Sequence, residues 1–456
     1  MSTLLLGWPL EGARRSNRPF SAGRKRYRFS DLAKTEQYRK DGHLVTFAPT
    51  GAGKGVRAII PNLLHYDGPV ITIDPKGENF AVTARYRRNV LGQEIFLLDP
   101  FEAVSTATLE RIGIERAKLN PLDLVQSFGP HAEGQLTMLA SLFSSERANS
   151  GGERFWDQSA QMLLAGVIGA SLDIARIKGE QHRFQGFIDL LFSDDVVYHL
   201  SVILDTRGKG LTPFAYRAIN DFLRRADKER SGVLSTVHSY LTPYISDALN
   251  NYLNVSSIKS TLIADGDNYT IYIVIPPSKL LSHSILLRMW VATMLSAIME
   301  RRVKPAKRTL FMLDECAQLG SLDELKKAIT LMRGYGLQVW MFFQDYSQIS
   351  SLYPTDYRTM VNNCGVFQTF GVPRNAAAVP LADALGKESP LDLVQLDRTQ
   401  QILSSSNEEP RILRLMNYLE DGLFAGRYDE NPLFAAQRRV KQRSNPFPEN
   451  AVKINY

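Results

Sequence analysis

The segment APTGAGKG, residues 48–55, constrains the fold and chemistry of this chain more than any other feature of its sequence. It follows an apolar run, residues 44–48, that is typical of a buried strand, and it precedes the stretch 56–60, which is expected to be helical. That context is the one a phosphate-binding P-loop requires. Closely spaced glycines let the backbone curl so that N–H groups point at phosphate oxygens, and the following helix adds its positive end. The expected nucleotide contacts are Thr50, Gly51, Ala52, Gly53, Lys54, Gly55 and Val56.

Two positions depart from the strict P-loop pattern, which starts with Gly and ends in Lys followed by Ser or Thr. Ala48 replaces the first Gly, and Gly55 replaces the hydroxyl residue. The second change has the larger consequence, because the missing hydroxyl normally binds Mg²⁺. Either water or another side chain supplies that ligand, or metal binding is weaker. Lys54 is retained and is expected to reach the β- and γ-phosphates.

A second motif is the apolar run LFML followed by Asp314 and Glu315. In P-loop ATPases the first acid holds Mg²⁺, usually through water, and the second polarises the attacking water. A carboxylate suits the second task because it can accept a proton beside a charged phosphate. Many buried strands end in acids, so this pair gains weight only together with the P-loop. Asp74, at the end of another apolar run, is a further candidate for ordering metal and water, with a turn-forming Asp-Pro as the alternative.

Two further polar residues complete the candidate site. Gln344 ends the run VWMFF, and its amide can donate to a γ-phosphate and accept from water. Arg333 lies between the acidic pair and Gln344, and a guanidinium there can stabilise a transferring phosphoryl group. If Arg333 lies at a subunit edge, it would act on the ATP of the neighbouring subunit. The alternatives are a polar strand end for Gln344 and an ordinary surface arginine for Arg333.

Short apolar runs before and after a long helical segment predict the fold class. From about residue 122 to 228, apolar residues recur at helical spacing and strand-like runs almost disappear. The pattern predicts an α/β fold with a mostly parallel sheet, helices on both faces, and an inserted all-α domain. The expected strands are at residues 44–48, 69–74, 94–99, 270–275, 310–313, 339–343, 366–370 and 423–425. The expected units are a basic N-terminal arm at 1–30, a nucleotide-binding domain at 31–121 and 231–456, and an all-α domain at 122–230.

The net charge of +7 is a modest positive excess that suits nucleic acid or an acidic membrane without requiring either. Basic residues at 14–28 are interleaved with aromatic ones and could touch DNA phosphate or anionic lipid, with a solvated arm as the alternative. The basic tail at 438–443 is expected to be a surface segment. The two cysteines, Cys316 and Cys364, lack metal-ligand spacing and are expected to be buried free thiols in a reducing cytoplasm. No run of about 20 apolar residues occurs, so the chain as given is expected to be soluble.

Taken together, the motifs resemble the TraG-type family of type IV secretion coupling proteins, the DNA-pumping ATPases of conjugation. Several ordered blocks are far more specific than one P-loop, and a branch of the family has Gly after the P-loop lysine, as at Gly55. The matching blocks run along nearly the whole chain: APTGAGKGV, IDPKGENFAVTARYRR, LNPLDLV, FWDQSAQMLL, YIVIPPSKL, FMLDECAQLG and FFQDYSQI.

This resemblance implies a RecA-like nucleotide-binding domain with an inserted all-helical domain, whose motif includes Trp156. It also implies ATP and Mg²⁺ as cofactors and a ring, typically hexameric, with ATP sites between subunits. By position, the family's phosphate lysine, metal acid, water acid, sensor and intersubunit arginine would be Lys54, Asp314, Glu315, Gln344 and Arg333.

Members of the family usually carry transmembrane helices before the P-loop, whereas Lys54 has only 53 residues before it here. Two alternatives stay open: a transmembrane region was removed, or the chain is a naturally short member that relies on a partner for docking. In either case the expected location is the cytoplasm, at the inner face of the bacterial inner membrane.

The leading hypothesis is an ATP-driven translocase that delivers a relaxase–DNA complex, or protein substrates, to a type IV secretion channel. The expected partners are single- or double-stranded DNA, the relaxase or relaxosome, channel components, and further copies of the chain in a hexamer, with a monomer when isolated. A chromosomal DNA pump of the FtsK type is one alternative, against which the helical insertion and the WDQSA motif argue. A non-hydrolysing adaptor for secreted proteins is another, against which the intact Asp314 and Glu315 argue.

Overall fold

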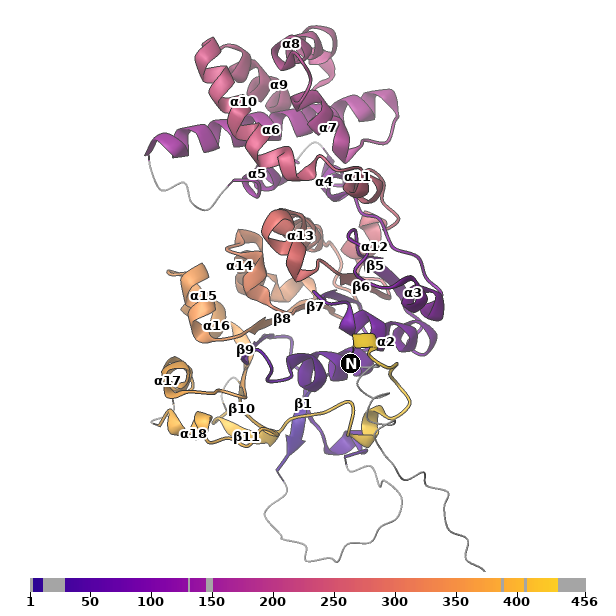
Figure 1. Cartoon of the computed structure of the whole chain (residues 1–456), viewed down its shortest axis with the longest axis vertical. Coiled ribbons are helices and arrows are strands. Elements are labelled where there is room, and N and C mark those ends of the chain that lie inside the picture. The colour runs from indigo at the N-terminus through magenta and orange to yellow at the C-terminus, as the bar shows by residue number, and fades with distance from the viewer. Residues whose placement is uncertain are drawn as a thin grey trace, which may run out of the picture.

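The computed structural model describes residues 3–10, 29–129, 132–144, 151–386, 389–405 and 408–433. Its centre is an eleven-stranded sheet in the order β2-β1-β11-β10-β9-β3-β8-β7-β4-β6-β5, with a helical part above it (Figure 1). The strands are β1 Leu4–Pro9, β2 Glu36–Tyr38, β3 His43–Phe47, β4 Val70–Ile73, β5 Glu94–Leu98, β6 Tyr269–Ile273, β7 Thr309–Leu313, β8 Leu337–Phe343, β9 Cys364–Thr369, β10 Gln400–Ser405 and β11 Arg411–Arg414.

The seven strands from β9 to β5 are parallel to one another. The pairings of β9 with β10 and of β10, β11, β1 and β2 in turn are antiparallel. Parallel strands are covered on both faces and therefore read as continuous apolar runs, which is why the sequence pattern located them. Every residue of β3, β4, β7 and β8 is buried. The expected mostly parallel α/β fold is thus confirmed.

Helices pack on both faces of the sheet. Leu44 of β3 packs with residues of α1 and α2, whereas its neighbours Val45 and Phe47 pack with residues of α13, α14 and α15. This alternation follows from successive strand side chains pointing to opposite faces. The helices outside the helical part are α1 Ile60–His65, α2 Glu78–Asn89, α3 Thr106–Ile112, α13 Pro277–Met299, α14 Asp323–Leu331, α15 Tyr346–Leu352, α16 Tyr357–Asn362, α17 Asn375–Ala384 and α18 Leu391–Val394.

Between β5 and β6 the described residues form helices and no strand. The members of this helical part are α4 Pro121–Gln126, α5 Glu133–Ser141, α6 Gly151–Lys178, α7 Phe184–Leu191, α8 Val196–Arg207, α9 Pro213–Leu223, α10 Asp227–Leu241, α11 Asp247–Leu253 and α12 Ser260–Asp265. Residue 230, the expected boundary, lies inside α10, and helices continue beyond it through α12. Helical periodicity continues through α12, so the pattern gave no signal until β6 begins at Tyr269.

Two other expectations need correction. Residues 423–425 do not form a strand: Gly422–Phe424 is a 3₁₀ turn whose Leu423 and Phe424 are buried with Trp8, so their apolar character reflects packing. The expected arm at 1–30 contains β1, which pairs with β2 and β11. The predicted basic segment at 14–28 and the tail at 438–443 lie outside the described residues.

Two helices, within residues 154–178 and 282–299, are long and apolar enough to cross a membrane by length and composition. In each, 67% of the apolar window is buried inside the protein, as in core helices. Cys316 and Cys364 are buried free thiols, as expected.

His43, the first residue of β3, has a fully buried side chain whose Nδ1 accepts a hydrogen bond from the Val339 N–H at 3.0 Å. That acceptor role requires a neutral ring. Burial, reinforced by the positive charge of Arg333, lowers the pKa of His43 to about 4. Protonation of His43 therefore opposes the pairing of β3 with β8.

The pKa of His43 makes the protein acid-sensitive in a defined pH window. Because the unfolded state binds this proton first, the stabilisation is complete above about pH 6.5 and is lost as the pH falls toward 4. Between pH 7 and pH 5 this one residue should remove about 2 kcal/mol of unfolding free energy. Because other groups, such as Asp74 with its raised pKa, also titrate in this range, the test is the difference between variants. The difference in unfolding free energy between wild type and His43→Asn, measured with urea, should change by about 2 kcal/mol in favour of His43→Asn from pH 7 to pH 5, whereas the exposed His199→Asn should follow the wild type. A difference that stayed constant with pH would contradict the assignment.

Candidate functional site

Four adjacent strands bring the candidate residues to one edge of the sheet. The P-loop follows β3, Gln344 follows β8, Asp314 and Glu315 follow β7, and Asp74 follows β4. These strands are neighbours in the order β3-β8-β7-β4 and are parallel. Their carboxyl ends therefore meet on the same side, where open α/β sheets bind ligands.

The P-loop conformation depends on two glycines with left-handed backbone angles, Gly51 at φ 83° and Gly53 at φ 87°. A residue with a side chain would be strained in either place. The loop opens into a short π-helix, Gly55–Ile59, a form that is common at functional sites. Of the predicted contact residues, all line the cavity except Ala52, which packs with Ala48, Phe370 and Leu415.

Lys54, Glu315 and Gln344 are joined by polar contacts. The Lys54 side chain is only 8% exposed, and its Nζ lies 3.1 Å from the Ala48 carbonyl oxygen and 3.0 Å from Glu315 Oε1. The other oxygen, Glu315 Oε2, accepts from Gln344 Nε2 at 2.8 Å. The Glu315 carboxylate thus contacts both the Lys54 ammonium and the Gln344 amide, the two groups that are expected to face a phosphate.

Glu315 also has an unusual backbone conformation, with φ 56° and ψ 52°. Residues other than glycine rarely adopt this left-handed region, and when they do the strain tends to occur at functional sites. The turn directs the Glu315 side chain away from the end of β7 and toward Lys54.

The carboxyl groups of Asp74 and Asp314 have pKa values well above their usual range. Burial raises the pKa of Asp74 to about 7 despite hydrogen bonds from Phe80 and Asn79, and the negative charge of Asp314 contributes. Burial and then the charge of Glu315 raise the pKa of Asp314 to about 6. Asp314 Oδ1 is buried and has no hydrogen-bond partner. A divalent cation would satisfy that oxygen and restore both carboxylates to their charged forms.

These residues surround a cavity of about 480 Å³. Among the described residues, no three His, Cys, Asp or Glu side chains are grouped so as to hold a metal by themselves. A metal held by Asp314 and Asp74 would therefore need oxygens of water and of a bound phosphate as its remaining ligands.

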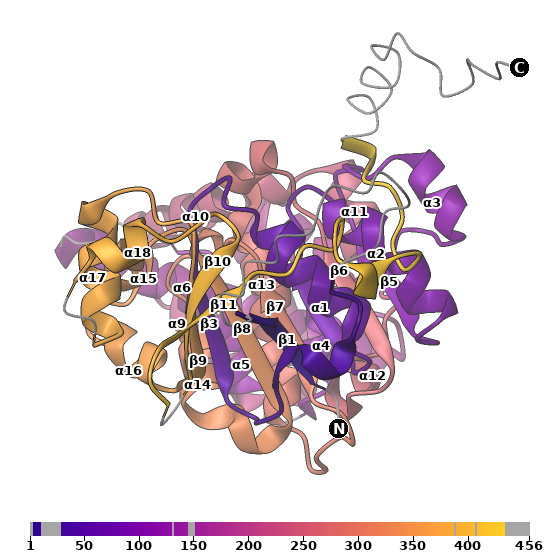
Figure 2. The same cartoon turned by 90° about the horizontal axis from the view of Figure 1, so that it is seen from below.

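Sequence reasoning missed part of the cavity wall. Tyr418, Leu419 and Asn431 belong to the segment after β11, which passes over α1 and reaches α2 (Figure 2). Backbone hydrogen bonds from Tyr418 to Val56 and from Asp429 to Val82 fix this path. No motif marks these residues, because only the chain path brings them to the P-loop. Glu78 and Asn79 also line the cavity, and the Asp-Pro-Lys-Gly-Glu turn was the available signal for them.

Arg333 lies away from this cavity. It is exposed in the turn Met332–Tyr335 before β8, and its guanidinium donates to the Asn363 carbonyl, just before β9, at 2.9 Å. The amino ends of parallel strands are at the edge opposite to their carboxyl ends. Arg333 therefore cannot serve the nucleotide cavity of its own chain.

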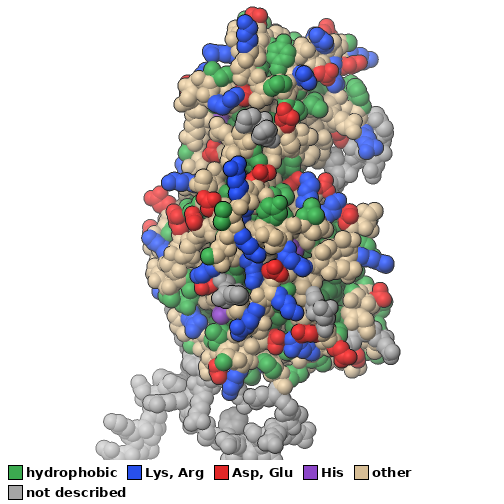
Figure 3. All heavy atoms as spheres, turned by 180° about the vertical axis from the view of Figure 1, so that it is seen from behind, with side chains coloured by type: hydrophobic (Ala, Val, Ile, Leu, Met, Phe, Trp, Pro, Cys, Tyr) green, Lys and Arg blue, Asp and Glu red, His purple; other side chains and the backbone are tan. Residues whose placement is uncertain are grey.

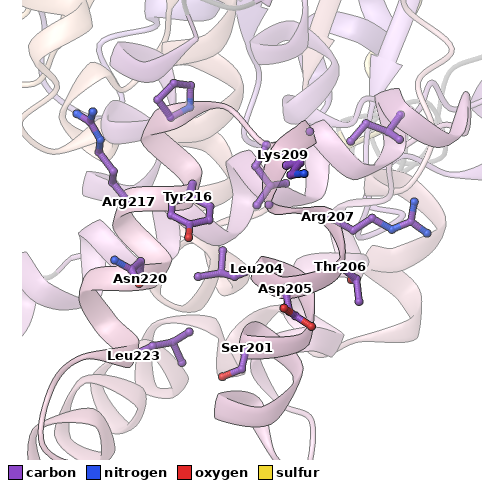
Figure 4. Close-up of a pocket in the computed structure, with 15 residues that line it drawn as sticks. Ser201, Leu204, Asp205, Thr206, Arg207, Lys209, Tyr216, Arg217, Asn220 and Leu223 are labelled. Atoms are coloured by element: carbon purple, nitrogen blue, oxygen red, sulfur yellow. The ribbon is translucent and has the colours of Figure 1, made fainter.

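A second, larger hollow lies in the helical part, away from the sheet (Figure 4). It is an open groove of about 1140 Å³ between α8 and α9. Arg207, Lys209 and Arg217 line it together with Tyr216, and Asp205 is the acid among its lining residues. None of the residues predicted from the sequence lies there.

Comparisons with known proteins agree with this geometry. The family described as type IV secretory system conjugative DNA transfer matches residues 13–409. The conjugal transfer protein TraG of Escherichia coli is 28% identical over 361 residues, 75% of this chain and 55% of that protein. The type IV secretion system-coupling protein VirD4 of Bartonella quintana is 25% identical over 317 residues, 67% of this chain and 47% of that protein. The chain thus spans about half the length of the curated relatives it matches.

Solved structures with the same fold include the bacterial conjugative coupling protein TrwBdeltaN70 in an unbound form, with a TM-score of 0.66 at 14% identity, covering 88% of this chain and 92% of that one. TrwB in complex with the non-hydrolysable ATP analogue ADPNP has a TM-score of 0.62 at 15% identity, and the match covers 91% of this chain and 94% of that one. These likenesses concern the fold, and they confirm the expected RecA-like core with its helical insertion. Because the family match extends over most of the sequence, the chain belongs to the type IV secretory system conjugative DNA transfer family.

Proposed function

We propose that this chain is the motor of a type IV coupling protein, an ATPase that moves DNA, with or without a bound relaxase, or protein substrates, toward a type IV secretion channel. The observation that carries the proposal is the convergence of Lys54, Asp314, Glu315 and Gln344 on one cavity behind a P-loop. Membership of the conjugative DNA transfer family supports DNA as the cargo. Solved TrwB complexes with ADPNP, and with ADP and Mg²⁺, support the cofactors.

The contacts of Glu315 suggest how nucleotide binding and catalysis are linked. Without ATP, Lys54 and Gln344 both hold the Glu315 carboxylate. An arriving γ-phosphate competes for both donors, because its charge is larger and its oxygens accept charge-assisted hydrogen bonds. Glu315 is then free to accept a hydrogen bond from a water molecule in line with the γ-phosphorus.

Hydrolysis follows from that arrangement. Water attacks the γ-phosphorus, its proton passes to the Glu315 carboxylate, and the bond from the γ-phosphorus to the bridging oxygen breaks to release ADP. Lys54 and the P-loop N–H groups stabilise the charge that develops on the phosphate oxygens. Asp314, with Asp74 as a further candidate, would hold Mg²⁺, which when bound would neutralise charge on the phosphates.

The assembly that fits this chemistry is a homo-hexameric ring. Arg333 and the nucleotide cavity lie at opposite edges of one sheet, so a head-to-tail ring would bring the arginine of one copy to the cavity of the next. We propose that the ring works at the cytoplasmic face of the bacterial inner membrane, docked to channel components. The helical part, with its basic groove between α8 and α9, is proposed as the domain that receives relaxase or protein cargo.

Contact with DNA would be spread over the surface. Figure 3 shows Lys and Arg side chains distributed over both the helical part and the sheet part, with acidic side chains among them. Such a surface suits weak, non-specific binding, which falls steeply with salt concentration. An affinity for DNA that did not depend on salt would count against this role.

Glu315→Gln tests the motor proposal against the non-hydrolysing adaptor. ATP turnover measured with DNA at high protein concentration should fall by about 100-fold or more, because glutamine cannot accept the proton. The amount of radiolabelled ATP that stays bound to the variant should be higher than for the wild type. Glu300→Gln, an exposed acid at the end of α13, is the matched control and should behave as the wild type. A wild-type protein that shows no turnover at any concentration, with single- or double-stranded DNA, would favour the adaptor.

Gly55 offers a second test, because a Cβ added there meets no atom within 4 Å and its backbone has no positive φ. Gly55→Ser should therefore fold normally and add the hydroxyl ligand that most P-loops supply to Mg²⁺. The Mg²⁺ concentration that gives half-maximal ATPase activity should fall severalfold. Gly55→Ala adds the same Cβ without a ligand, so an equal fall in both variants would mean that helix propensity, and not metal binding, is responsible.

Sharing of sites between subunits can be tested by mixing two inactive variants, Lys54→Ala and Arg333→Ala. In mixed rings, roughly a quarter of the interfaces would pair an intact P-loop with an intact arginine. ATPase activity should therefore reappear on mixing, whereas neither variant is active alone. Arg217→Ala in the α8–α9 groove is the control and should keep full activity. If Arg333→Ala alone keeps full activity, the shared-site role of Arg333 is wrong.

A further inference from the structure

A cleft of about 630 Å³ lies where the helical part joins the sheet. Four segments form it: the loop after β5, the segment that enters the helical part, the end of α11, and the first turn of α13. Its lining residues are Pro100, Phe101, Glu102, Lys118, Asn251, Tyr252 and Lys279. No motif pointed to this cleft, and it is separate from the nucleotide cavity, with which it shares no lining residue.

The cleft presents two aromatic rings and two ammonium groups. Phe101 and Tyr252 are half-buried, while Lys118 and Lys279 are exposed. Lys279 Nζ lies 5.7 Å from the centroid of the Phe101 ring. Glu102 is the acid of the lining, and its Oε1 accepts a long hydrogen bond of 3.4 Å from the Tyr252 hydroxyl. Aromatic faces beside lysines are the combination that binds single-stranded nucleic acid.

The loop that carries Phe101 is held in a fixed shape. The fully buried Asp99 carboxylate accepts hydrogen bonds from the N–H groups of Ala103 at 2.8 Å and Val104 at 3.0 Å, and pairs with Arg116 at 3.1 Å. Glu102 has a positive φ of 54°, which is unusual for a residue with a side chain. A preorganised loop of this kind presents its ring without an additional ordering cost on binding.

The other wall is the junction of the helical part. The Leu119 N–H donates to the Tyr252 carbonyl at 3.1 Å, and the Ser257 N–H donates to the Lys118 carbonyl at 2.8 Å. The entering and leaving segments are thus tied together, so that Lys118 and Tyr252 are held on the same side of the cleft.

The first turn of α13 connects the cleft to the nucleotide cavity. Pro277 lines the nucleotide cavity and Lys279, two residues later, lines the cleft. The helix is interrupted at His283, whose φ of −130° and ψ of 21° are not helical. The His283 ring packs edge-on against Phe101, with centroids 4.9 Å apart. The segment between Pro277 and His283 therefore touches both sites and is separated by a kink from the rest of α13.

We propose that this cleft binds single-stranded DNA, with a base stacked on Phe101 or Tyr252 and neighbouring phosphates on Lys118 and Lys279. The proposal deepens the motor function and rests on it. A single strand fits better than a duplex because its base faces are free to stack, whereas those of a duplex are covered by adjacent bases. Because α13 begins at the nucleotide cavity, a change there shifts Lys279 relative to Phe101 and so alters the grip on the strand.

The first experiment measures binding of a fluorescein-labelled oligothymidylate to the full chain by anisotropy, with ADPNP present, over a series of salt concentrations. Phe101→Leu should weaken binding about tenfold while leaving the salt dependence unchanged, since it removes stacking only. The double variant Lys118→Ala, Lys279→Ala should reduce the slope of log affinity against log salt by about 1.4, or 0.7 for each phosphate contact.

Matched controls separate this cleft from general surface charge. Lys228→Ala and Tyr198→Leu change an exposed lysine of α10 and an exposed tyrosine of α8, neither of which lines the cleft or the α8–α9 groove, and should leave oligothymidylate binding as in the wild type. ATPase activity without DNA should be unchanged in all cleft variants, and its stimulation by the oligonucleotide should be reduced. If Phe101→Leu lowers the unfolding temperature, Tyr252→Leu supplies the same test from the opposite wall.

The outcomes distinguish the cleft from the motor function. If the cleft variants bind oligothymidylate and respond to it as the wild type does, the proposal that the cleft binds single-stranded DNA is wrong, while the motor proposal stands. Variants that bind DNA normally but lose binding of a relaxase would assign the cleft to a protein and also overturn it. If the wild type folds and hydrolyses ATP but binds no single-stranded DNA, both the cleft proposal and the DNA role are wrong.

Photo-crosslinking with iododeoxyuridine should label a peptide that contains Phe101 or Tyr252, and labelling confined to other peptides would contradict the proposal.

Discussion

The parallel register of β3, β8, β7 and β4 is the constraint on which the rest of the structure depends. Because these four strands are neighbours and run in the same direction, everything that follows their carboxyl ends must share one edge of the sheet. Lys54, Asp74, Asp314, Glu315 and Gln344 therefore line one cavity although they come from segments far apart in the sequence. The same rule places Arg333, which precedes β8, at the opposite edge.

Electrostatics at that edge describe a site prepared for a charged ligand. Burial raises the pKa of Asp74 and of Asp314, and the negative charge of a neighbouring carboxylate, Asp314 and Glu315 respectively, adds to each shift. Glu315, in a strained backbone conformation, neutralises Lys54 and accepts from Gln344. These contacts are mutually exclusive with phosphate contacts, so nucleotide binding would exchange one set of charge pairs for another without leaving a buried charge unpaired.

The helical part is joined to this site through short connections. Its entering and leaving segments are hydrogen-bonded to each other, and Trp290 of α13 donates to the Leu119 carbonyl at 3.0 Å. Helix α13 therefore contacts the nucleotide cavity at its first turn and the junction of the helical part along its length. Through α13, contacts therefore run without a break from the nucleotide cavity to the place where the two parts meet.

The sequence by itself determined the fold class, the parallel strands and the residues of the nucleotide cavity that carry recognisable chemistry. It could do so because buried parallel strands read as apolar runs and because a P-loop uses glycines and a lysine at fixed spacing. Only the tertiary structure decided the antiparallel strands β1, β10 and β11 and the contribution of Tyr418 and Asn431 to the cavity. It also decided where the helical part ends, which is beyond residue 230. The same holds for the cleft around Phe101 and Lys279. The pairing of β1 with β11 and the contact of Tyr418 with Val56 join segments hundreds of residues apart, and no local pattern of hydrophobicity or spacing records which distant segments will meet.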